Sequence, residues 1–278
     1  MSRIAVTGFG LVGHAVAAEA ARRGHDVLVA SRTVEDGPRA LRTELPSGLG
    51  RLAAWRPDLI VHTAAETSVQ RCEDDPVHAR AANVESSEAV AALGVPVVGF
   101  STDWVFDGRD GGYAEDAPLA PQNVYGATKA AAEQALLAND SALVVRGTFL
   151  GRRPDGRSGL VERLLDPATG ARVPDGKTAS PLWVGHAAAA VLDLAAAGAT
   201  GVVHIGSRDA IDWVSLAHAI RAARGLNGAL IPLPFAGPPD TSLDVSKAER
   251  LLGRPLPSVA ETVSAMVARP PLRYEVNA

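Results

Sequence analysis

The sequence predicts an α/β protein built on a Rossmann-type, doubly wound parallel sheet with a small C-terminal substrate-binding cap. Two observations predict this fold. Apolar β-type segments alternate with helical segments over residues 3–146, and a glycine-rich turn follows the first of these strands. Strands connected in this way lie parallel, and helices cover both faces of their sheet. Ligands of such sheets bind beyond the carboxyl ends of the strands, so the functional residues are expected there.

The N-terminal half is expected to contain five strands and three long helices. The strands are predicted at residues 3–7, 26–30, 59–63, 95–101 and 142–146, and the helices at 11–23, 77–93 and 125–137. Gly24 ends the first helix, because glycine is the usual residue just after a helix. A polar loop with several Gly and Pro residues fills positions 103–122. We assign residues 1–150 to an NAD(P)-binding Rossmann domain.

The regular alternation of predicted strands and helices ends after Gly147. Residues 151–175 are rich in Gly, Pro, Arg and Asp, and are expected to form an irregular, mobile segment over the site. Further helices are predicted at 186–197, 213–223 and 259–268, and strands at 201–205 and 229–233. Ser246 and Glu249 have the spacing of a capping box for a short helix that ends at Leu252. Residues 151–278 therefore read as a substrate-side cap that is interleaved with the first domain rather than independent of it.

Composition excludes several classes of function. The 278 residues include 47% hydrophobic and 21% charged residues, an ordinary globular balance. The net charge of -4 gives no basic footprint for nucleic acid. There is no apolar run of the roughly 18 residues that a membrane span needs, and no secretory leader. The histidines show no metal-ligand spacing, so no metal is expected. The single cysteine, Cys72, reads as a reduced thiol, and a cytoplasmic location is expected.

The glycine-rich turn has the form G-x-G-x-x-G and opens a helix directly after a strand. Its residues are Gly8, Phe9, Gly10, Leu11, Val12 and Gly13. The glycines allow a tight turn, a close approach of the backbone to a pyrophosphate, and close helix–strand packing. The start of the helix supplies unpaired N–H donors and a partial positive charge. The turn therefore predicts dinucleotide binding.

The second strand ends in Ser31, Arg32 and Thr33. An NAD site usually places an acid here to accept a hydrogen bond from the ribose 2′-hydroxyl, whereas an arginine suits a 2′-phosphate. We therefore expect NADP(H) to be preferred over NAD(H). The alternative is an exposed arginine after a strand, with no role in binding.

A chemical pair follows about 110 residues after the glycine-rich turn. Tyr125 and Lys129 are four residues apart at the start of a predicted helix, so both lie on one face. A carbonyl that accepts hydride needs a proton donor, and a nearby ammonium is expected to lower the pKa of the tyrosine for that role. Thr102, at the end of a strand, could donate to the same oxygen. A capping role for Thr102 is the alternative.

These residues together resemble a known family, the extended short-chain dehydrogenases/reductases and, within them, the dTDP-4-dehydrorhamnose reductase group. The resemblance rests on residues 8–13, 62–67, 101–108 and 125–129, with Glu73, Pro76 and Asn83. It implies a catalytic set of Thr102, Tyr125 and Lys129, with Lys129 also binding the cofactor. It implies that Ala64 and Ala65 lie along the cofactor. It further implies that NADPH reduces the 4-keto group of a deoxysugar nucleotide.

The chain departs from the family on the substrate side. Trp104 replaces the family's tyrosine after Thr102 and Asp103, and Phe149 stands at a tryptophan position. The absence of glutamate at 104 argues against a dehydratase. In a segment near the C-terminus, Gly237 stands where the family has an arginine, and Asp240 stands where it has an asparagine. We expect Arg152, Arg153 and Arg157 to compensate for the lost charge, or the substrate to lack a nucleotide diphosphate. The residues expected to face the substrate are Asp103, Trp104, Phe149, Arg152 and Arg153.

Three functions remain open at this point. The first is an NADPH-dependent ketoreductase acting on a dTDP-4-keto-6-deoxysugar or a related metabolite. The second is a sugar-nucleotide epimerase on the same fold, and the third is a non-catalytic NAD(P)-binding regulatory subunit. The expected partner is a small keto substrate, with neither nucleic acid nor membrane, and a homodimer is compatible with the sequence.

Overall fold

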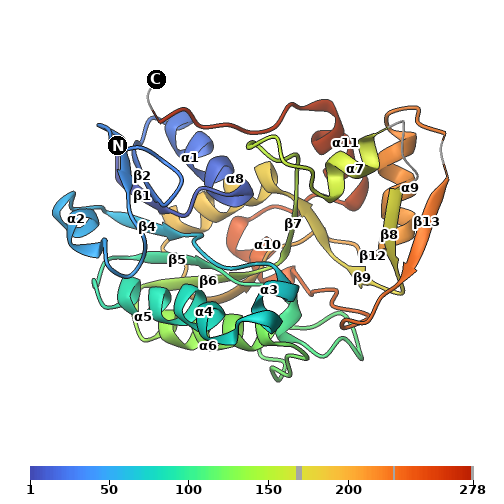
Figure 1. Cartoon of the computed structure of the whole chain (residues 1–278), viewed down its shortest axis with the longest axis horizontal. Coiled ribbons are helices and arrows are strands. Elements are labelled where there is room, and N and C mark those ends of the chain that lie inside the picture. The colour runs from blue at the N-terminus through green and yellow to red at the C-terminus, as the bar shows by residue number, and fades with distance from the viewer. Residues whose placement is uncertain (167–170, 228, 277–278) are drawn as a thin grey trace.

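A seven-stranded sheet forms the centre of the protein. The computed structural model describes residues 1–166, 171–227 and 229–276, and in this part the strand order is β11-β6-β5-β4-β1-β2-β3 (Figure 1). All neighbouring strands are parallel. The strands are β1 (Arg3–Thr7), β2 (Asp26–Ser31), β3 (Ala40–Arg42), β4 (Leu59–His62), β5 (Val97–Phe100), β6 (Ala142–Arg146) and β11 (Gly201–His204). The strand order reverses at β1, between β2 and β4, and this switch point opens a crevice for ligands.

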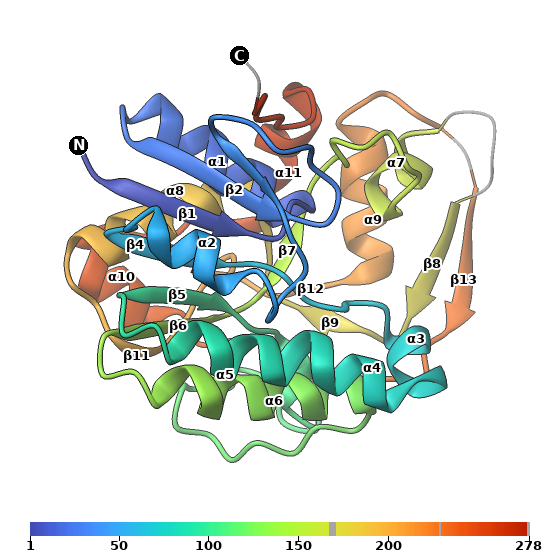
Figure 2. The ribbon, with the colours of Figure 1, turned by 60° about the vertical axis from the view of Figure 1, so that its left-hand side comes forward.

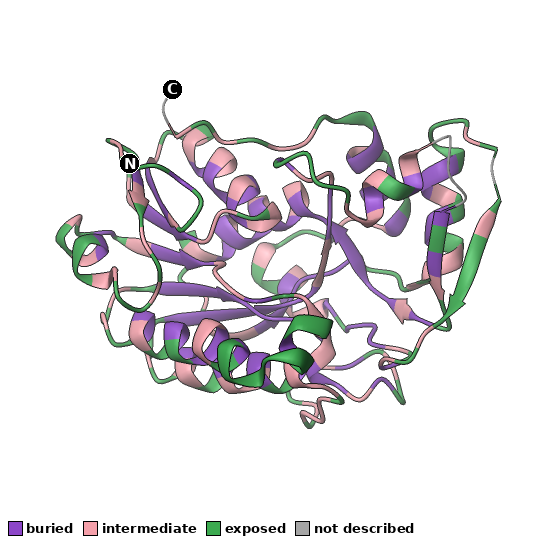
Figure 3. Ribbon diagram, viewed as in Figure 1, coloured by how far each residue is buried: buried purple, intermediate pink, exposed green. Residues whose placement is uncertain are grey.

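Helices cover both faces of the sheet, as predicted. Figure 2 shows α1 (Leu11–Arg22) and α8 (Val184–Ala196) on one face, and α5 (Ser86–Ala91) and α6 (Val124–Leu137) on the other. Successive strand residues enter opposite cores: Ile4 and Val6 pack into the α1/α8 side, whereas Ala5 packs into the α5/α6 side. The strands are buried on both faces (Figure 3), which explains their continuous apolar sequence.

The helix predicted at 77–93 is built from three consecutive pieces. They are α4 (Pro76–Arg80), a π-helical turn (Ala81–Glu85) and α5. Asp75 caps α4, because its side chain accepts a hydrogen bond from the His78 backbone. A π turn inside a helix often marks a functional position. Here it contains Asn83, which is described with the site below.

The prediction of an irregular segment at 151–175 is wrong in part. It contains α7 (Leu160–Leu165) and β8 (Ala171–Asp175), and β7 (Thr148–Leu150) comes just before it. These elements are short, so their periodicity is too weak to read from sequence. The same reason explains why α2 (Leu49–Ala54), α3 (Val69–Asp74) and β3 were not predicted. Residues 167–170 lie outside the described residues.

The capping box predicted for Ser246 and Glu249 is also wrong. Val245 precedes α10 (Ser246–Leu252) without a side-chain cap, and the Ser246 backbone donates to Asp244 instead. The Glu249 carboxylate accepts from the Leu256 backbone. A capping box is present at α11 (Val259–Ala268), where Ser258 and Glu261 exchange hydrogen bonds. Spacing alone does not reveal which way a side chain turns.

In the part of the chain that the structure describes, three two-stranded sheets lie beyond the carboxyl ends of the central strands. They pair β7 with β10 (Pro181–Trp183), β9 (Thr178–Ala179) with β12 (Ile211–Asp212), and β8 with β13 (Leu230–Pro234). With α7 and α9 (Trp213–Ala222), β8 and β13 form the right-hand end of the molecule in Figure 1. Strand β11, although late in the sequence, pairs with β6 of the central sheet. The chain therefore contributes to both parts of the molecule after residue 150.

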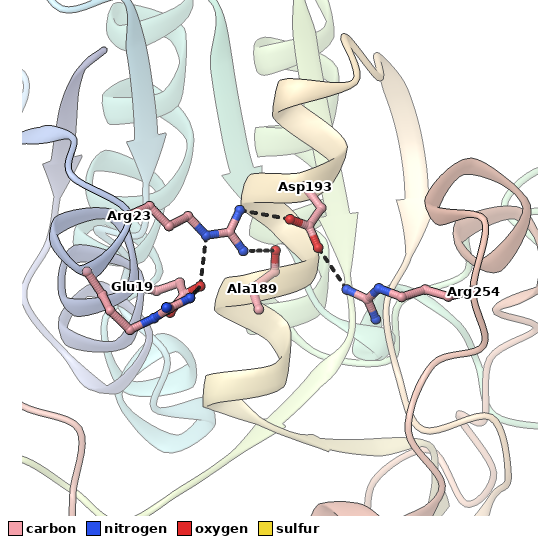
Figure 4. A network of polar contacts seen from close by, with 6 residues as sticks. Glu19, Arg23, Ala189, Asp193 and Arg254 are labelled. Carbon is pink, nitrogen blue, oxygen red and sulfur yellow. Dashed lines mark hydrogen bonds and ion pairs between the residues drawn. The ribbon is translucent and has the colours of Figure 1, made fainter. Parts of the chain in front are cut away.

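A polar network fixes the relative position of the helices on the α1/α8 face. Arg23, at the end of α1, bonds Glu19, the Ala189 carbonyl and Asp193 of α8 (Figure 4). Arg254 reaches Asp193 from the segment after α10, at 2.8 Å. The network lies at the amino ends of the strands, so it stabilises the scaffold and leaves the opposite edge for the site.

Candidate functional site

The glycine-rich turn connects β1 to α1, as predicted. Gly8 has a φ of +84°, in the left-handed region that favours glycine. A Cβ atom on Gly8 would lie 2.5 Å from the Ala64 nitrogen, and one on Gly13 would lie 2.2 Å from the Gly8 carbonyl oxygen. The Thr63 hydroxyl donates to the carbonyls of Thr7 and Gly8. The turn is therefore packed directly on residues 63 and 64, which follow β4.

Gly10 differs from the other two glycines. A Cβ atom at this position would meet nothing within 4 Å, so the fold itself does not require a glycine there. Gly10 precedes α1, and no side chain caps the helix. The first turn of α1 therefore has no side-chain acceptor, and the space beside Gly10 is open. This cradle fits a pyrophosphate, because both the donors and the room it needs are present.

Phe9 and the first turn of α1 form one wall of this cradle. The Phe9 ring stacks on His14 with centroids 3.5 Å apart. Burial lowers the pKa of His14 to about 4, and the carboxylate of Asp155 opposes that shift. A Cβ atom on Gly151 would lie 3.1 Å from Leu11. The segment after β7 therefore lies beside the glycine-rich turn.

The end of β2 presents three polar side chains. The hydroxyls of Ser31 and Thr33 are 3.1 Å apart, and Arg32 pairs with Glu44 at 3.1 Å. Both partners of the ion pair are more than 60% exposed, at 63% and 64%. An exposed pair of this kind contributes at most about 1 kcal/mol. Arg32 is thus available for another anion at small cost.

Helix α6 carries Tyr125 and Lys129 on one face. The Asn123 side chain caps the helix by accepting from the Gly126 backbone at 2.7 Å, and Glu73 accepts from the Val124 backbone at 2.7 Å. The Lys129 side chain is buried, and its ammonium donates to the Phe100 carbonyl at 2.6 Å. Burial lowers the pKa of Lys129 to about 8. The ammonium is therefore held at the carboxyl end of β5.

The expected lowering of the Tyr125 pKa is not found. Removal of the phenol from water raises the pKa of Tyr125 to about 12, although a hydrogen bond with Thr102 acts in the opposite direction. The ammonium of Lys129 is bonded to Phe100 rather than to the phenol. In this state Tyr125 is a protonated phenol in contact with the Thr102 hydroxyl. Tyr125 therefore lies beside Thr102 as expected, but it is a weaker acid than expected.

Thr102 and Trp104 approach Tyr125 from the loop after β5. Thr102 caps a short 3₁₀ turn (Asp103–Val105) by accepting from the Trp104 backbone, so the capping role foreseen for Thr102 is present as well. Trp104 meets the Tyr125 ring edge-on, with centroids 6.2 Å apart. A Cβ atom on Gly126 would lie 2.3 Å from the Trp104 carbonyl oxygen. Glycine after Tyr125 thus allows this close approach.

Asn83 joins the cofactor side of the site to α6. Its side chain accepts from the Glu66 backbone N–H at 2.7 Å and donates to the Glu66 carbonyl and to the Thr128 hydroxyl. The Asn83 amide therefore holds Glu66 against the helix that carries Tyr125.

A buried ion pair below the site was missed at the sequence level. Arg146 at the end of β6 and Glu133 of α6 are 4% and 1% exposed and lie 2.7 Å apart. Ser101 donates to Glu133, and Arg146 also donates to the Glu115 carbonyl. The partners are 13 residues apart in sequence and share no motif, so only a buried acid inside an amphipathic helix could have suggested the pair.

The remaining residues expected at the substrate lie in two places. Phe149 packs edge-on against Phe100 at 5.3 Å, near the end of β5. Arg153 and Arg157 both pair with Asp155, at 2.7 and 2.6 Å, so their charges are already partly compensated. Asp155 acts on His14, which places this cluster by the glycine-rich turn. Asp240 caps its own loop by accepting from the Ser242 backbone.

Neither a metal cluster nor a membrane-spanning helix occurs in the described residues. No group of three or more His, Cys, Asp or Glu side chains is placed to hold a metal ion there. No helix in that part is long and apolar enough to cross a membrane. Cys72 is buried and carries a free thiol.

The family model described as RmlD substrate binding domain matches residues 2–270. The chain belongs to this RmlD family. The family resemblance and the Rossmann-type α/β fold expected from the sequence are confirmed, and the chain is an NAD(P)H-dependent oxidoreductase.

Individual RmlD relatives are similar to this chain over nearly its full length. A probable low-salt glycan biosynthesis reductase of Haloferax volcanii is 32% identical over 93% of this chain and 95% of its own. A dTDP-4-dehydrorhamnose reductase of Sinorhizobium fredii is 29% identical over 95% and 96%. The crystal structure of the Bacillus anthracis dTDP-4-dehydrorhamnose reductase in complex with NADP superimposes with a TM-score of 0.84. That structure is 24% identical and covers 96% of this chain and 98% of its own.

Proposed function

We propose that this RmlD-family protein is an NADPH-dependent ketoreductase that reduces the 4-keto group of a dTDP-4-keto-6-deoxysugar or a related metabolite. The observation that carries the proposal is the meeting of Tyr125 and Thr102 at the carboxyl edge of the sheet, with Lys129 one helical turn further along α6. Two of the relatives are named as dTDP-4-dehydrorhamnose reductases, which supports the substrate class.

The chemistry needs one hydride and one proton. A bound nicotinamide dinucleotide would supply the hydride to the carbonyl carbon. Tyr125 carries its proton in the ligand-free protein, because burial raises its pKa to about 12, and it would give that proton to the carbonyl oxygen as Lys129 stabilises the phenolate that forms. Thr102 orients that oxygen by a hydrogen bond. The Lys129 ammonium would bind the nicotinamide ribose and stabilise the phenolate that remains.

The cofactor contacts are assigned on the same basis. The turn of Gly8, Phe9, Gly10, Leu11, Val12 and Gly13 would hold the pyrophosphate, and Ala64 and Ala65 would lie along the cofactor. Ser31, Arg32 and Thr33 would surround the adenosine ribose. Arg32 supports a 2′-phosphate, because the ion pair it must leave is weak and exposed. We therefore propose NADP(H) rather than NAD(H).

The reaction is tested by following NADPH absorbance with a panel of 4-keto and 3-keto deoxysugar nucleotides. Stoichiometric oxidation of NADPH with formation of the alcohol is expected. Conversion of a sugar nucleotide without net oxidation would instead indicate an epimerase. Cofactor binding without any conversion across the panel would favour a regulatory subunit.

Cofactor choice is tested by calorimetry with Arg32→Asp. The wild type should bind NADPH more tightly than NADH, and the variant should reverse the order, since about 1.5–3 kcal/mol is at stake in a hydrogen bond to a charged group. Arg51→Asp is the matched control, because Arg51 is also an exposed arginine paired with an acid, Asp36, at 3.0 Å. Equal affinities of the wild type for the two cofactors would remove the proposal.

A further inference from the structure

Lys177 is a buried cation that the proposed mechanism does not use. It lies between β8 and β9, and 4% of it is exposed. Its ammonium lies 4.4 Å from the ring centroid of Trp104, 5.2 Å from that of Trp213 and 5.4 Å from that of Phe235. Aromatic faces attract a cation, but they do not replace hydrogen-bond acceptors for its three N–H donors.

The ammonium has no such acceptor in the described parts of the chain. Neither a hydrogen bond nor an ion pair reaches it there, and its electrostatic partner is Asp103. Both oxygens of Asp103 are engaged by hydroxyls, one by Thr102 and the other by Thr241. Asp103 thus balances part of the charge without accepting the donors. The Lys177 nitrogen keeps a small solvent-accessible surface, so an oxyanion can reach it and accept the donors that no group in the described chain accepts.

The backbone around Lys177 is firmly fixed. The backbone N–H of Trp213 donates to the Lys177 carbonyl at 2.9 Å. The backbone of the next residue, Thr178, bonds the backbone of Pro239 and of Thr241. Several segments therefore meet at this residue: the end of β8, the start of α9 and residues 239–241. The backbone that carries the Lys177 side chain is therefore fixed before any ligand binds, which lowers the entropic cost of binding.

Trp104 connects this cation to the reaction centre. The same indole meets the Tyr125 ring edge-on, lies 4.4 Å from the Lys177 ammonium, and meets Phe235 edge-on at 5.7 Å. Phe235 in turn lines a cavity of about 390 Å³ together with Arg163 and Arg172. Arg163 and Arg172 thus line a hollow that shares Phe235 with the surroundings of Lys177, whereas Arg153 and Arg157 are paired with Asp155.

We propose that Lys177 is a substrate-binding residue whose ammonium donates hydrogen bonds to an oxyanion of the substrate, a phosphate or a carboxylate, held on the aromatic surface of Trp104. The proposal rests on the proposed function, because it places the substrate beside Tyr125. It assigns to Lys177 the selection of an anionic keto substrate, a role that we expected from the sequence for Arg152, Arg153 and Arg157.

The test measures binding rather than turnover. Calorimetry of the NADP⁺-loaded protein would compare dTDP-glucose, which carries phosphates alone, with UDP-glucuronic acid, which adds a carboxylate to the sugar. Lys177→Met keeps the length and apolar stem of the side chain but removes its charge, and should weaken binding about 10–100-fold. Lys177→Arg should restore most of the affinity. Raised salt should weaken wild-type binding more than binding to the Met variant.

The two probes distinguish the source of the oxyanion. Equal losses for both would assign Lys177 to the diphosphate, and a loss for UDP-glucuronic acid alone would assign it to a carboxylate. Unchanged affinity for both probes in Lys177→Met, or no binding of either by the wild type, overturns the proposal. Lys247→Met is the matched control, since Lys247 donates to the Val202 carbonyl in the central sheet.

Failure of the two proposals can be told apart. Lys177-dependent binding in a protein that oxidises no NADPH with any keto sugar would leave this inference standing and remove the ketoreductase. Reduction of a keto sugar by the wild type, together with unchanged affinities in Lys177→Met, would remove this inference and leave the ketoreductase standing. The affinity for NADP⁺ should be unchanged in Lys177→Met, which excludes a general structural effect.

Discussion

Tyr125 is the residue on which the proposed chemistry depends most directly. Tyr125→Phe removes the proton donor and keeps the ring that packs against Trp104. We expect kcat to fall about 10²–10⁴-fold with cofactor affinity nearly unchanged. Lys129→Ala should reduce both, and Thr102→Val should cost less than either. Single-turnover rates with an accepted keto substrate measure all three, and native turnover of Tyr125→Phe would show that the assignment is wrong.

Gly10 is a single residue at which the proposed cofactor cradle can be tested. Gly10→Val should abolish dinucleotide binding but keep the native thermal unfolding temperature, because its Cβ would meet no atom of the fold. Gly13→Val is the contrasting variant, since its Cβ would collide with the Gly8 carbonyl at 2.2 Å and should destabilise the protein. Native cofactor affinity in Gly10→Val would show that the turn is only structural.

At the scale of elements, the contact between α6 and the end of β6 depends on the Glu133–Arg146 pair. Glu133→Ala leaves the Arg146 charge buried without its partner, so we expect a loss of about 3–5 kcal/mol in the free energy of unfolding. Urea titration measures this loss. Glu44→Ala, which breaks the exposed pair with Arg32, is the control and should cost about 1 kcal/mol or less. A similar cost for both variants would contradict the reasoning.

Elements of the site are also held by contacts between side chain and backbone. Asn83 lies in the π turn between α4 and α5, and its amide joins Glu66 to Thr128. Gly126 lets α6 approach the turn that contains Trp104. Neither residue touches the place where the carbonyl is expected, yet both set the distance between the cofactor side and Tyr125.

At the scale of the whole molecule, the central sheet is completed by the second half of the chain. Strand β11 pairs with β6, and α8 covers the same face of the sheet as α1 (Figure 2). A fragment of residues 1–150 would leave β6 as an unpaired edge and expose the apolar surface beneath α8. We expect this fragment to lack a cooperative thermal transition by circular dichroism, in contrast to the full chain. A cooperative transition in the fragment would show that the first 150 residues fold alone.

The sequence by itself determined the strand and helix alternation of residues 3–146, the G-x-G-x-x-G turn and the one-face pair of Tyr125 and Lys129. Each of these depends on neighbours a few residues apart, so periodicity and spacing are enough to read them. The elements α2, α7 and β8 escaped prediction because segments this short show no clear periodicity. The capping box predicted for Ser246 and Glu249 was wrong because spacing does not fix the direction of a side chain.

Only the tertiary structure decided the rest. The aromatic surroundings of Lys177 come from three segments, carrying Trp104, Trp213 and Phe235. The raised pKa of Tyr125 depends on burial in the folded chain, and this effect runs opposite to the expected lowering. Burial and long-range pairing are properties of the packed molecule. They arise from residues far apart in sequence, where local patterns carry no information.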